Sequence, residues 1–308
     1  MIKIQENILL KEHSTFKIGG AAKYFTLANN ESQLIEALKW SRNKNIPFLI
    51  LGNGSKILFS DKGYQGLVIK IQISNIQIQG EKIICGAGVL INKILGIVTA
   101  KGLTGLEWAA GIPGTIGGAI FGNAGAFGFE TKDIVENVKV LNLKDFKITE
   151  FQNEKCQFSY RSSIFKERKN YIILQTELRL RQSEGEDVRK KIKENLLYRK
   201  GKHPLEYPSV GSIFQNVKLS KENQKLIEKF PDLKQFSQGG EIPTAHLINS
   251  CQLKGKTIGG AQISEKHPNF IINIGEAKAQ DVISLIKLIK KKIKEKFGIN
   301  LKEEIIII

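Results

Sequence analysis

The feature that most constrains this chain is a dense cluster of glycines between residues 107 and 128. The cluster contains the run Ala110-Gly111-Ile112-Pro113-Gly114-Thr115-Ile116-Gly117-Gly118-Ala119, and Asn123-Ala124-Gly125 follows it. Glycine adopts backbone conformations that other residues avoid and lets other atoms approach the main chain closely. We therefore expect this segment to fold as tight turns against a neighbouring element or a ligand.

A second glycine turn, Gly52-Asn53-Gly54-Ser55, follows the short apolar strand predicted for residues 47–51. The backbone N–H groups of such turns can surround phosphate oxygens, and a dinucleotide with a pyrophosphate would use two turns. Neither turn matches a P-loop or the Gly-x-Gly-x-x-Gly signature in the setting of a Rossmann domain. Each turn alone is as consistent with tight packing as with binding, whereas the two together favour a ligand.

The remaining patterns predict alternating strands and helices with a boundary near residue 201, where a polar stretch contains two prolines. Apolar spacing predicts helices over residues 31–42, 91–101, 186–200 and 278–297. Short apolar runs predict strands at residues 66–71, 76–79, 82–85, 138–141 and 171–174, and in the tail at 303–308. The lysines opposite the apolar stripe of the last helix fit a solvated face or a membrane-surface helix, and we favour the solvated face.

The chain is basic, with 47 Lys and Arg against 30 Asp and Glu and a formal charge of +17. Such a charge raises the question of nucleic acid, anionic membranes or anionic substrates. Only seven of the basic residues are arginine, so we favour a lysine-rich composition spread over a solvated surface. We expect no nucleic-acid partner, because no stacking motif or DNA-binding helix pair occurs. We expect no membrane span, because no apolar run approaches the roughly 18 to 20 residues required.

Cysteine and histidine usage points to a reducing compartment and to no metal site. Cys85, Cys156 and Cys251 are widely spaced and fit neither a disulfide framework nor a C-x-x-C site. The four histidines are scattered, without the carboxylate spacing of a metal centre. The first residues lack the pattern of a secretion signal, so we expect a cytoplasmic protein, and we favour a monomer.

Further motifs occur in a fixed order along nearly the whole chain. They are Ser14-Thr15-Phe16-Lys17-Ile18-Gly19-Gly20, the two glycine turns, Tyr160-Arg161-Ser162-Ser163-Ile164-Phe165, Gly211-Ser212-Ile213-Phe214-Gln215-Asn216, Leu253-Lys254-Gly255-Lys256-Thr257-Ile258-Gly259-Gly260-Ala261 and Ile263-Ser264-Glu265-Lys266-His267-Pro268-Asn269-Phe270. This ordered set resembles the bacterial UDP-N-acetylenolpyruvoylglucosamine reductases, and it is far more specific than any one of its motifs.

The resemblance implies an α+β flavoprotein of peptidoglycan precursor synthesis. Its two-domain FAD-binding fold, of the vanillyl-alcohol oxidase type, would comprise residues 1–70 and 71–200. A third α+β domain, residues 201–298, would bind the substrate, and strand 299–308 would pack back toward the site. NADPH would reduce FAD, which would reduce UDP-N-acetylglucosamine enolpyruvate to UDP-N-acetylmuramate. The alternative is another FAD-dependent oxidoreductase of the same superfamily.

The resemblance also implies three catalytic residues: Arg161 binds the substrate carboxylate, Ser212 donates a proton, and Glu304 is the C-terminal glutamate. A guanidinium can bind a carboxylate through two hydrogen bonds and stabilise charge that builds there. The simpler alternatives are a surface ion pair for Arg161 and a helix N-cap for Ser212. Alternation along the predicted tail strand means that only one of Glu303 and Glu304 can face the site.

The same resemblance assigns the cofactor and substrate contacts. Tyr160, Lys200 and Asn216 are the expected substrate-binding residues. The expected cofactor-binding residues are Gly52, Asn53, Gly54, Ser55, Gly111, Pro113, Gly114, Gly117, Gly118, Asn123, Ala124 and Gly125.

Some positions depart from the family pattern. Lys56 stands where asparagine is more common after the serine, Gln215 where lysine is usual, and Val217 where proline is usual. The stretch from Arg161 to Ser212 is shorter than in members that carry an inserted loop with a substrate-clamping tyrosine. The chain therefore resembles the subgroup that lacks this loop.

Overall fold

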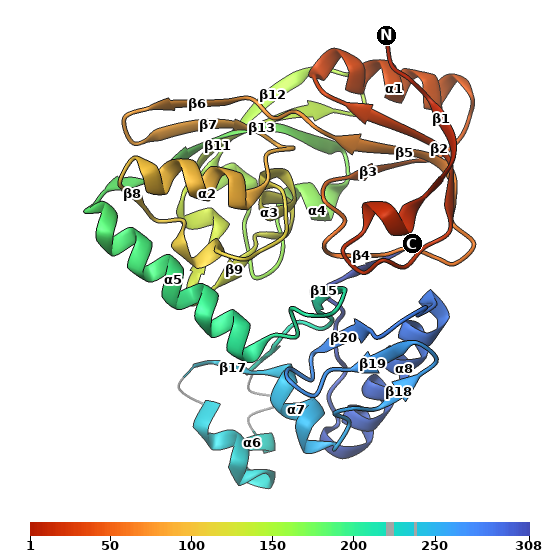
Figure 1. Cartoon of the computed structure of the whole chain (residues 1–308), viewed down its shortest axis with the longest axis vertical. Coiled ribbons are helices and arrows are strands. Elements are labelled where there is room, and N and C mark those ends of the chain that lie inside the picture. The colour runs from red at the N-terminus through yellow and green to blue at the C-terminus, as the bar shows by residue number, and fades with distance from the viewer. Residues whose placement is uncertain (220–224, 237–238) are drawn as a thin grey trace. The chain divides into compact units, whose positions relative to one another are not determined.

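The computed structural model describes residues 1–219, 225–236 and 239–308, which form two compact units of mixed α and β structure. Figure 1 traces the elements of each unit. Unit 1 comprises Met1–Leu9, Ala21–Gly54 and Tyr64–Gly201, and unit 2 comprises Leu10–Gly20, Ser55–Gly63 and Lys202–Ile308. The chain therefore passes between the units several times, and residues distant in sequence complete each core.

The first sheet of unit 1 has the order β1-β2-β5-β3. Its strands are β1 (Gln5–Leu9), β2 (Ala21–Ala28), β5 (Tyr64–Ile71) and β3 (Phe48–Leu51). β5 is parallel to both β2 and β3, which requires the crossover helix α1 (Glu31–Asn43). The Asn30 side chain caps α1 by accepting from the Gln33 N–H, and Leu34, Ala37 and Leu38 on one face are buried.

The second sheet of unit 1 is antiparallel and has the order β12-β11-β13-β7-β6. Its strands are β12 (Ile148–Gln152), β11 (Val135–Asn142), β13 (Tyr171–Arg179), β7 (Lys82–Gly86) and β6 (Ile76–Gln79). Helices α2 (Ile91–Ala100), α3 (Ile116–Gly122) and α5 (Gly185–Lys202) lie on one side of this sheet, and α4 (Ile164–Arg168) packs on β13 (Figure 1). One apolar cluster runs through both sheets, so unit 1 has a single core.

Unit 2 is built on a sheet with the order β15-β20-β19-β18. The strands are β15 (Ser209–Ser212), β20 (Phe270–Asn273), β19 (Ala261–Ile263) and β18 (Thr257–Ile258). Helix α8 (Ala279–Phe297) packs on this sheet through a buried apolar stripe, and α7 (Thr244–Ser250) packs on α8. A separate parallel pair joins β4 (Ile57–Leu58) to β21 (Ile306–Ile307), which brings the tail beside residues near position 57.

Short elements complete both units. In unit 1 they are β8 (Leu103–Thr104) paired with β14 (Arg181–Gln182), β9 (Gly125–Ala126) paired with β10 (Phe129–Glu130), and 3-10 turns at Glu107–Ala109, Thr131–Asp133 and Asn153–Cys156. In unit 2 they are β16 (Val217–Lys218) paired with β17 (Glu241–Ile242), α6 (Lys225–Lys229), and 3-10 turns at Leu10–His13 and Pro231–Phe236.

The helices predicted from apolar spacing are confirmed to within two residues at either end. The predicted tail strand is shorter than expected, because only Ile306–Ile307 form a ladder and Glu303 makes an isolated bridge to Phe214. The apolar stripe of α8 lies in the core of unit 2 with Val282 and Ile289 fully buried, which rules out a membrane-surface role for that stripe. No helix among the described residues combines the length and apolarity needed to cross a membrane.

Replacing Ile289 with alanine should lower the free energy of unfolding by about 2–5 kcal/mol, because it leaves a cavity where a fully buried side chain packed. Chemical denaturation followed by circular dichroism measures this change. The exposed neighbour Lys287, replaced by alanine, is the control and should change the free energy of unfolding by less than about 0.5 kcal/mol. Equal losses in the two variants would contradict the packing of α8.

Candidate functional site: a glycine cradle and a serine–lysine–glutamate cluster

The two glycine turns predicted from the sequence meet within unit 1. The Asn53 side-chain amide donates to the Pro113 carbonyl at 2.7 Å. A Cβ atom added at Gly52 would lie 2.7 Å from the Thr115 hydroxyl oxygen, so only glycine fits there. That hydroxyl caps α3 by accepting from the Gly118 N–H at 3.2 Å. The two turns therefore form one surface of closely packed main chain, which we call the glycine cradle (residues 52–54 and 113–118).

The first turn of α3 also packs closely against Ala87, which lies between β7 and α2. The Gly117 N–H donates to the Ala87 carbonyl at 2.9 Å. A Cβ atom at Gly117 would lie 2.8 Å from the Ala87 Cβ and 2.9 Å from its carbonyl oxygen. Since the Ala87 N–H is itself bonded to the Leu174 carbonyl at 2.8 Å, the position of α3 depends on this glycine.

A buried cation lies beneath the glycine-rich segment. Arg199 of α5 is only 9% exposed, and its guanidinium donates to the Trp108 carbonyl at 3.2 Å and lies over the Phe127 ring at 5.3 Å. Gly111 has a φ of 79°, and a Cβ atom there would lie 3.1 Å from the Arg199 side chain. Burial lowers the pKa of Arg199, and among the described residues its Nε has no hydrogen-bond partner.

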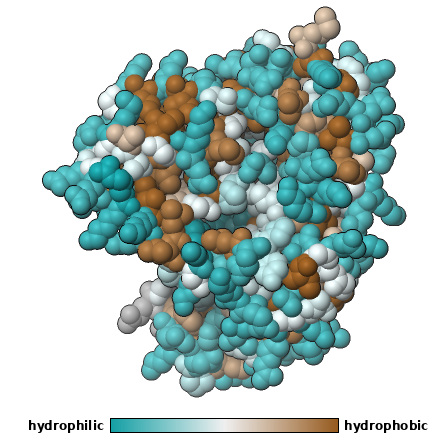
Figure 2. Space-filling model, in the orientation of Figure 1, coloured by the Kyte–Doolittle hydropathy of each residue, from teal (hydrophilic) through white to brown (hydrophobic). Residues whose placement is uncertain are grey.

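A groove opens beside this arginine, between α2 and α5. Its volume is about 610 Å³, and Gly111, Leu196 and Lys200 are among the residues that line it. In Figure 2, apolar side chains gather over the region of α2 and α5, whereas hydrophilic side chains cover most of the rest of this face. The predicted substrate residue Lys200 therefore lies at the rim of an amphipathic groove in unit 1.

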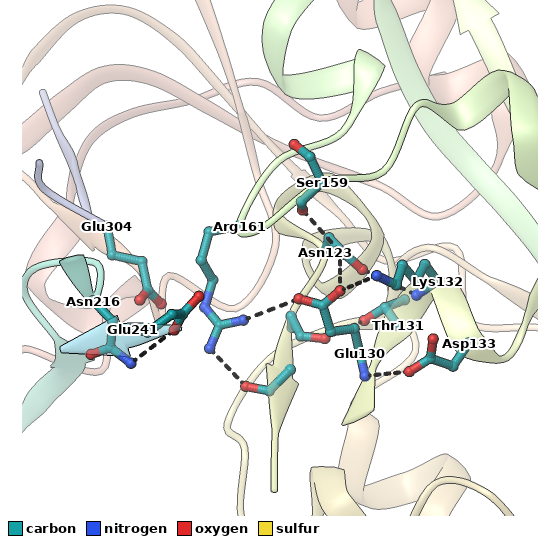
Figure 3. Close-up of polar contacts among 12 residues, drawn as sticks. Asn123, Glu130, Thr131, Lys132, Asp133, Ser159, Arg161, Asn216, Glu241 and Glu304 are labelled. Atoms are coloured by element: carbon teal, nitrogen blue, oxygen red, sulfur yellow. Dashed lines mark hydrogen bonds and ion pairs between the residues drawn. The ribbon is translucent and has the colours of Figure 1, made fainter. Parts of the chain in front are cut away.

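Arg161 is held at the edge of α3 by its backbone and by its neighbours. It has a positive φ of 55°, and its guanidinium donates to the Gly125 carbonyl at 2.9 Å and stacks 4.9 Å from the Tyr160 ring centre. Glu130 is 4.0 Å away, the limit of an ion pair (Figure 3). A Cβ atom at Gly125 would lie 3.2 Å from Arg161 Nη1, so this glycine makes room for the guanidinium.

Asn123 holds the loop that carries Arg161. It is fully buried and ends α3 with a left-handed φ of 41°. Its side-chain amide donates to the Ser159 carbonyl at 2.9 Å and to Glu130 at 3.1 Å, and its oxygen accepts from the Lys132 N–H at 3.1 Å (Figure 3). These bonds join α3 to the segment immediately before Arg161. The predicted cofactor residue Asn123 therefore positions a predicted catalytic residue.

In unit 2, Ser212 ends strand β15 opposite Phe270 of β20, which excludes the helix N-cap considered from the sequence. Gly211 precedes it with a φ of 74°. The chain after Ser212 is fixed by the buried Asn269, whose side chain accepts from the Phe214 N–H at 3.0 Å and donates to the Phe214 carbonyl at 2.9 Å. Ser212 therefore lies on a rigid strand end.

The two carboxylates of the tail, Glu303 and Glu304, form ion pairs with different lysines. Lys290 of α8 lies 2.7 Å from Glu303, and Lys56 lies 2.8 Å from Glu304. The Glu304 N–H donates to the Ile213 carbonyl at 2.7 Å, directly beside Ser212. The structure therefore brings Glu304 and Ser212 together within unit 2 and places Glu303 against the helix.

Asn216 lies further along the chain from Ser212. Its side-chain amide donates to Glu241 at 3.4 Å (Figure 3). Its oxygen accepts from the Thr244 N–H at 3.3 Å. Arg161 and Tyr160 belong to unit 1, whereas Ser212, Asn216 and Glu304 belong to unit 2. The predicted catalytic and substrate-binding residues are thus divided between the two units.

The residues of unit 1 fit FAD. The glycine cradle brings residues of little side-chain bulk together at Gly52 and Gly118, as a pyrophosphate site requires, and the buried Arg199, whose Nε has no hydrogen-bond partner among the described residues, favours an anionic or strongly accepting group. Among the described residues, no group of three or more His, Cys, Asp and Glu side chains could hold a metal ion.

Comparison with known proteins agrees with both halves of this description. Residues 22–151 match the FAD binding domain, and residues 203–308 match the C-terminal domain of UDP-N-acetylenolpyruvoylglucosamine reductase. The reductase of Caldanaerobacter subterraneus subsp. tengcongensis is 41% identical over 99% of this chain and 94% of its own length. The chain belongs to the UDP-N-acetylenolpyruvoylglucosamine reductase family. The reductase of Caldicellulosiruptor bescii is 40% identical over 96% of this chain and 88% of its own.

A solved structure places this family member in the same fold. The crystal structure of the Thermus caldophilus reductase superposes with a TM-score of 0.78 at 28% identity, covering 100% of this chain and 99% of that one. The predicted α+β class, with an FAD-binding domain followed by a reductase C-terminal domain, is confirmed.

Two side chains of this reductase family member were not assigned from the sequence. Arg199 belongs to the basic stretch before Pro204, which is consistent with either a cluster near the substrate diphosphate or a solvated one, although Val188, Ile192, Asn195 and Arg199 share the helical spacing that marks the inner face of α5. Lys56 was noted only as a departure from the family pattern. Nothing local in the sequence indicates its partners, because Ser212 and Glu304 lie far along the chain.

Replacing Gly117 with alanine should weaken FAD binding about tenfold or more, because the new methyl group displaces α3 from Ala87. Titration of the apoprotein with FAD, followed by quenching of flavin fluorescence, measures the dissociation constant. Gly122, at the other end of α3, has no atom within 4 Å of an added Cβ, so its alanine variant is the matched control. An unchanged dissociation constant for Gly117→Ala would contradict the cradle as the cofactor site.

Proposed function

We propose that Arg161, Ser212 and Glu304 carry the reduction of the enolpyruvyl double bond in this chain. The observation on which the proposal rests is the hydrogen bond from the Glu304 N–H to the Ile213 carbonyl, which keeps the main chain of Glu304 beside Ser212. Membership of the family establishes the reaction itself, in which UDP-N-acetylglucosamine enolpyruvate is reduced to UDP-N-acetylmuramate for peptidoglycan precursors. FAD, when bound, supplies hydride-transfer chemistry, and NADPH is the reductant.

Ser212 is the proposed proton donor. Hydride addition to the CH2 carbon of the enolpyruvyl group leaves negative charge on the adjacent carbon, which bears the carboxylate, and that carbon must then take up a proton. A serine hydroxyl is a weak acid, but it can protonate a strongly basic carbanion when it is held at hydrogen-bond distance. The rigid end of β15, fixed through Asn269, supports this role because it gives the hydroxyl a defined position.

Arg161 is the proposed binding group for the substrate carboxylate. Its guanidinium is held from behind by the Gly125 carbonyl and the Tyr160 ring. A planar, permanently charged group that is already oriented can stabilise the extra negative charge of an enolate-like intermediate without reorganising. Glu304 is proposed to orient the substrate carboxylate together with Arg161, or to relay the proton that Ser212 donates.

The glycine turns are proposed to hold FAD through Gly52, Asn53, Gly54 and Ser55 and through the cluster at residues 111–125. Asn53 and Pro113 support this because their hydrogen bond joins the two turns. Tyr160, Lys200 and Asn216 are the proposed substrate contacts. The match of residues 203–308 to the reductase C-terminal domain argues against the alternative of a different oxidoreductase of the superfamily.

We also propose that the chain belongs to the subgroup without the tyrosine-bearing loop. The short path from β13 through β14 into α5 supports this, because no further element interrupts it. Cytoplasmic location is proposed on the three cysteines, all free thiols. The monomeric state and the division of the FAD-binding half at residue 70 stay predictions, which light scattering and limited proteolysis can test.

Replacing Ser212 with alanine should separate the two half-reactions. Under anaerobic conditions, NADPH should bleach the flavin at nearly the normal rate, whereas reoxidation by UDP-N-acetylglucosamine enolpyruvate should slow by a factor of about 100 or more. Stopped-flow absorbance of the flavin measures both rates. Ser209→Ala, on the same strand, is the control and should leave both rates unchanged. An equal loss in both half-reactions of Ser212→Ala would rule out the proposed proton donor.

Replacing Arg161 with lysine should weaken substrate binding to the oxidised enzyme about tenfold or more, because a lysine cannot form the paired hydrogen bonds of a guanidinium. Titration of the flavin absorbance with UDP-N-acetylglucosamine enolpyruvate gives the dissociation constant. Arg168→Lys, at an exposed position of α4, is the control and should bind normally. Normal substrate affinity in Arg161→Lys would remove Arg161 from the carboxylate site.

A further inference from the structure

Lys56 joins two residues that have proposed catalytic roles. Its ammonium donates to the Ser212 carbonyl at 2.8 Å and lies 2.8 Å from the Glu304 carboxylate. Lysine carries three donor hydrogens on one compact charge, so one side chain can make both contacts at once. Lys56 directly follows the predicted cofactor turn in the sequence, yet it belongs to unit 2, together with Ser212 and Glu304.

The main chain around Lys56 fixes this arrangement. Ile306 donates its N–H to the Lys56 carbonyl at 2.9 Å, so the tail that carries Glu304 is bonded to the residue whose side chain binds Glu304. Gly211 brings its backbone close from the other side, since a Cβ atom there would lie 3.4 Å from the Lys56 ammonium. The ammonium is therefore packed between the strand end of β15 and the tail.

Burial distinguishes this ion pair from the many lysine contacts on the surface. The Glu304 side chain is only 13% exposed, although that of Lys56 is 41% exposed. Glu303 forms a comparable pair with Lys290, at 2.7 Å, and its side chain is 29% exposed. A partly buried carboxylate that loses its cation is left poorly solvated and free to change rotamer. Removing Lys56 should therefore disturb the position of Glu304.

We propose that Lys56 is a positioning residue of the reductase, which holds the Glu304 carboxylate and the Ser212 main chain in one arrangement. The inference rests on the proposed roles of Ser212 and Glu304. Lys56 touches neither reacting atoms nor cofactor in this account, and it acts through the two residues that it binds. Its contribution therefore falls on the protonation half-reaction and not on flavin reduction.

The test compares Lys56→Met, Lys56→Arg and Lys290→Met in the FAD-bound enzyme. In Lys56→Met, reoxidation of the reduced flavin by UDP-N-acetylglucosamine enolpyruvate should slow about 10- to 100-fold, the cost of a small misplacement of reacting groups. Reduction by NADPH should stay within about twofold of normal, and kcat should fall more than KM rises. Lys56→Arg keeps the charge and should recover most of the rate. Lys290→Met removes the matched pair and should leave both half-reactions unchanged.

A double variant separates a positioning role from a general loss of structure. If Lys56 acts partly through Glu304 and partly through Ser212, Lys56→Met should slow the Glu304→Gln variant by a smaller factor than it slows the parent enzyme. Three results would each overturn the inference. They are rate losses that multiply in the double variant, equal losses in both half-reactions of Lys56→Met, and a normal rate in Lys56→Met. Lys56→Gln serves in place of the methionine variant if the latter fails to retain FAD.

A different result would contradict the proposed function. If Glu304→Gln and Ser212→Ala reoxidise at the normal rate, the assigned catalytic roles are wrong, and the role of Lys56 falls with them. If those two variants are slow while Lys56→Met is normal, the catalytic roles stand and only the inference about Lys56 is rejected.

Discussion

Unit 2 depends on the hydrogen bonds that attach the tail to two segments far from it in the chain. Ile306 and Ile308 donate to the carbonyls of Lys56 and Leu58, and Glu304 donates to the carbonyl of Ile213. Each bond is worth only about 1 kcal/mol. Together they set the register between the tail and the strand end of β15, and a shift of one residue would exchange Glu304 for Glu303.

Unit 1 is subject to a different constraint, because it must leave space for a cofactor while its core stays packed. Small residues bring α3 and the two glycine turns so close together that added methyl groups would collide with Thr115 and Ala87. Arg199 is buried below the same segment, where its guanidinium donates to the Trp108 carbonyl and its Nε has no hydrogen-bond partner among the described residues. A bound anionic or accepting group would satisfy that remaining donor.

The sequence alone predicted the structural features that depend on local patterns. Apolar spacing predicted α1, α2, α5 and α8, and the glycine runs predicted two turns that do meet, through Asn53 and Pro113. Alternation predicted that Glu303 and Glu304 diverge, and they bind different lysines. The family pattern supplied the candidate roles of Arg161, Ser212 and Glu304.

What the sequence could not supply depends on contacts between distant segments. Lys56 looked like part of the cofactor turn, because its partners are known only once β4 and β21 pair. The burial of Arg199 could not be read from its basic stretch, because it depends on the packing of α5 beneath Trp108. The division of the chain also mixes segments, since Leu10–Gly20 and Ser55–Gly63 join Lys202–Ile308 in unit 2.

This interleaving has a consequence for synthesis on the ribosome. Every segment of unit 1 precedes residue 202, so its core can assemble on the emerging chain while the rest is still being made. The two early segments of unit 2 must wait for residues that are translated much later, because Ile57 and Leu58 pair with Ile306 and Ile307, and the Phe16 carbonyl accepts from the Asn273 side chain. Until then β4 is an unpaired apolar strand, which exposes the nascent chain to aggregation or chaperone capture. A cofactor that binds the first unit early would act during this interval as a folding ligand.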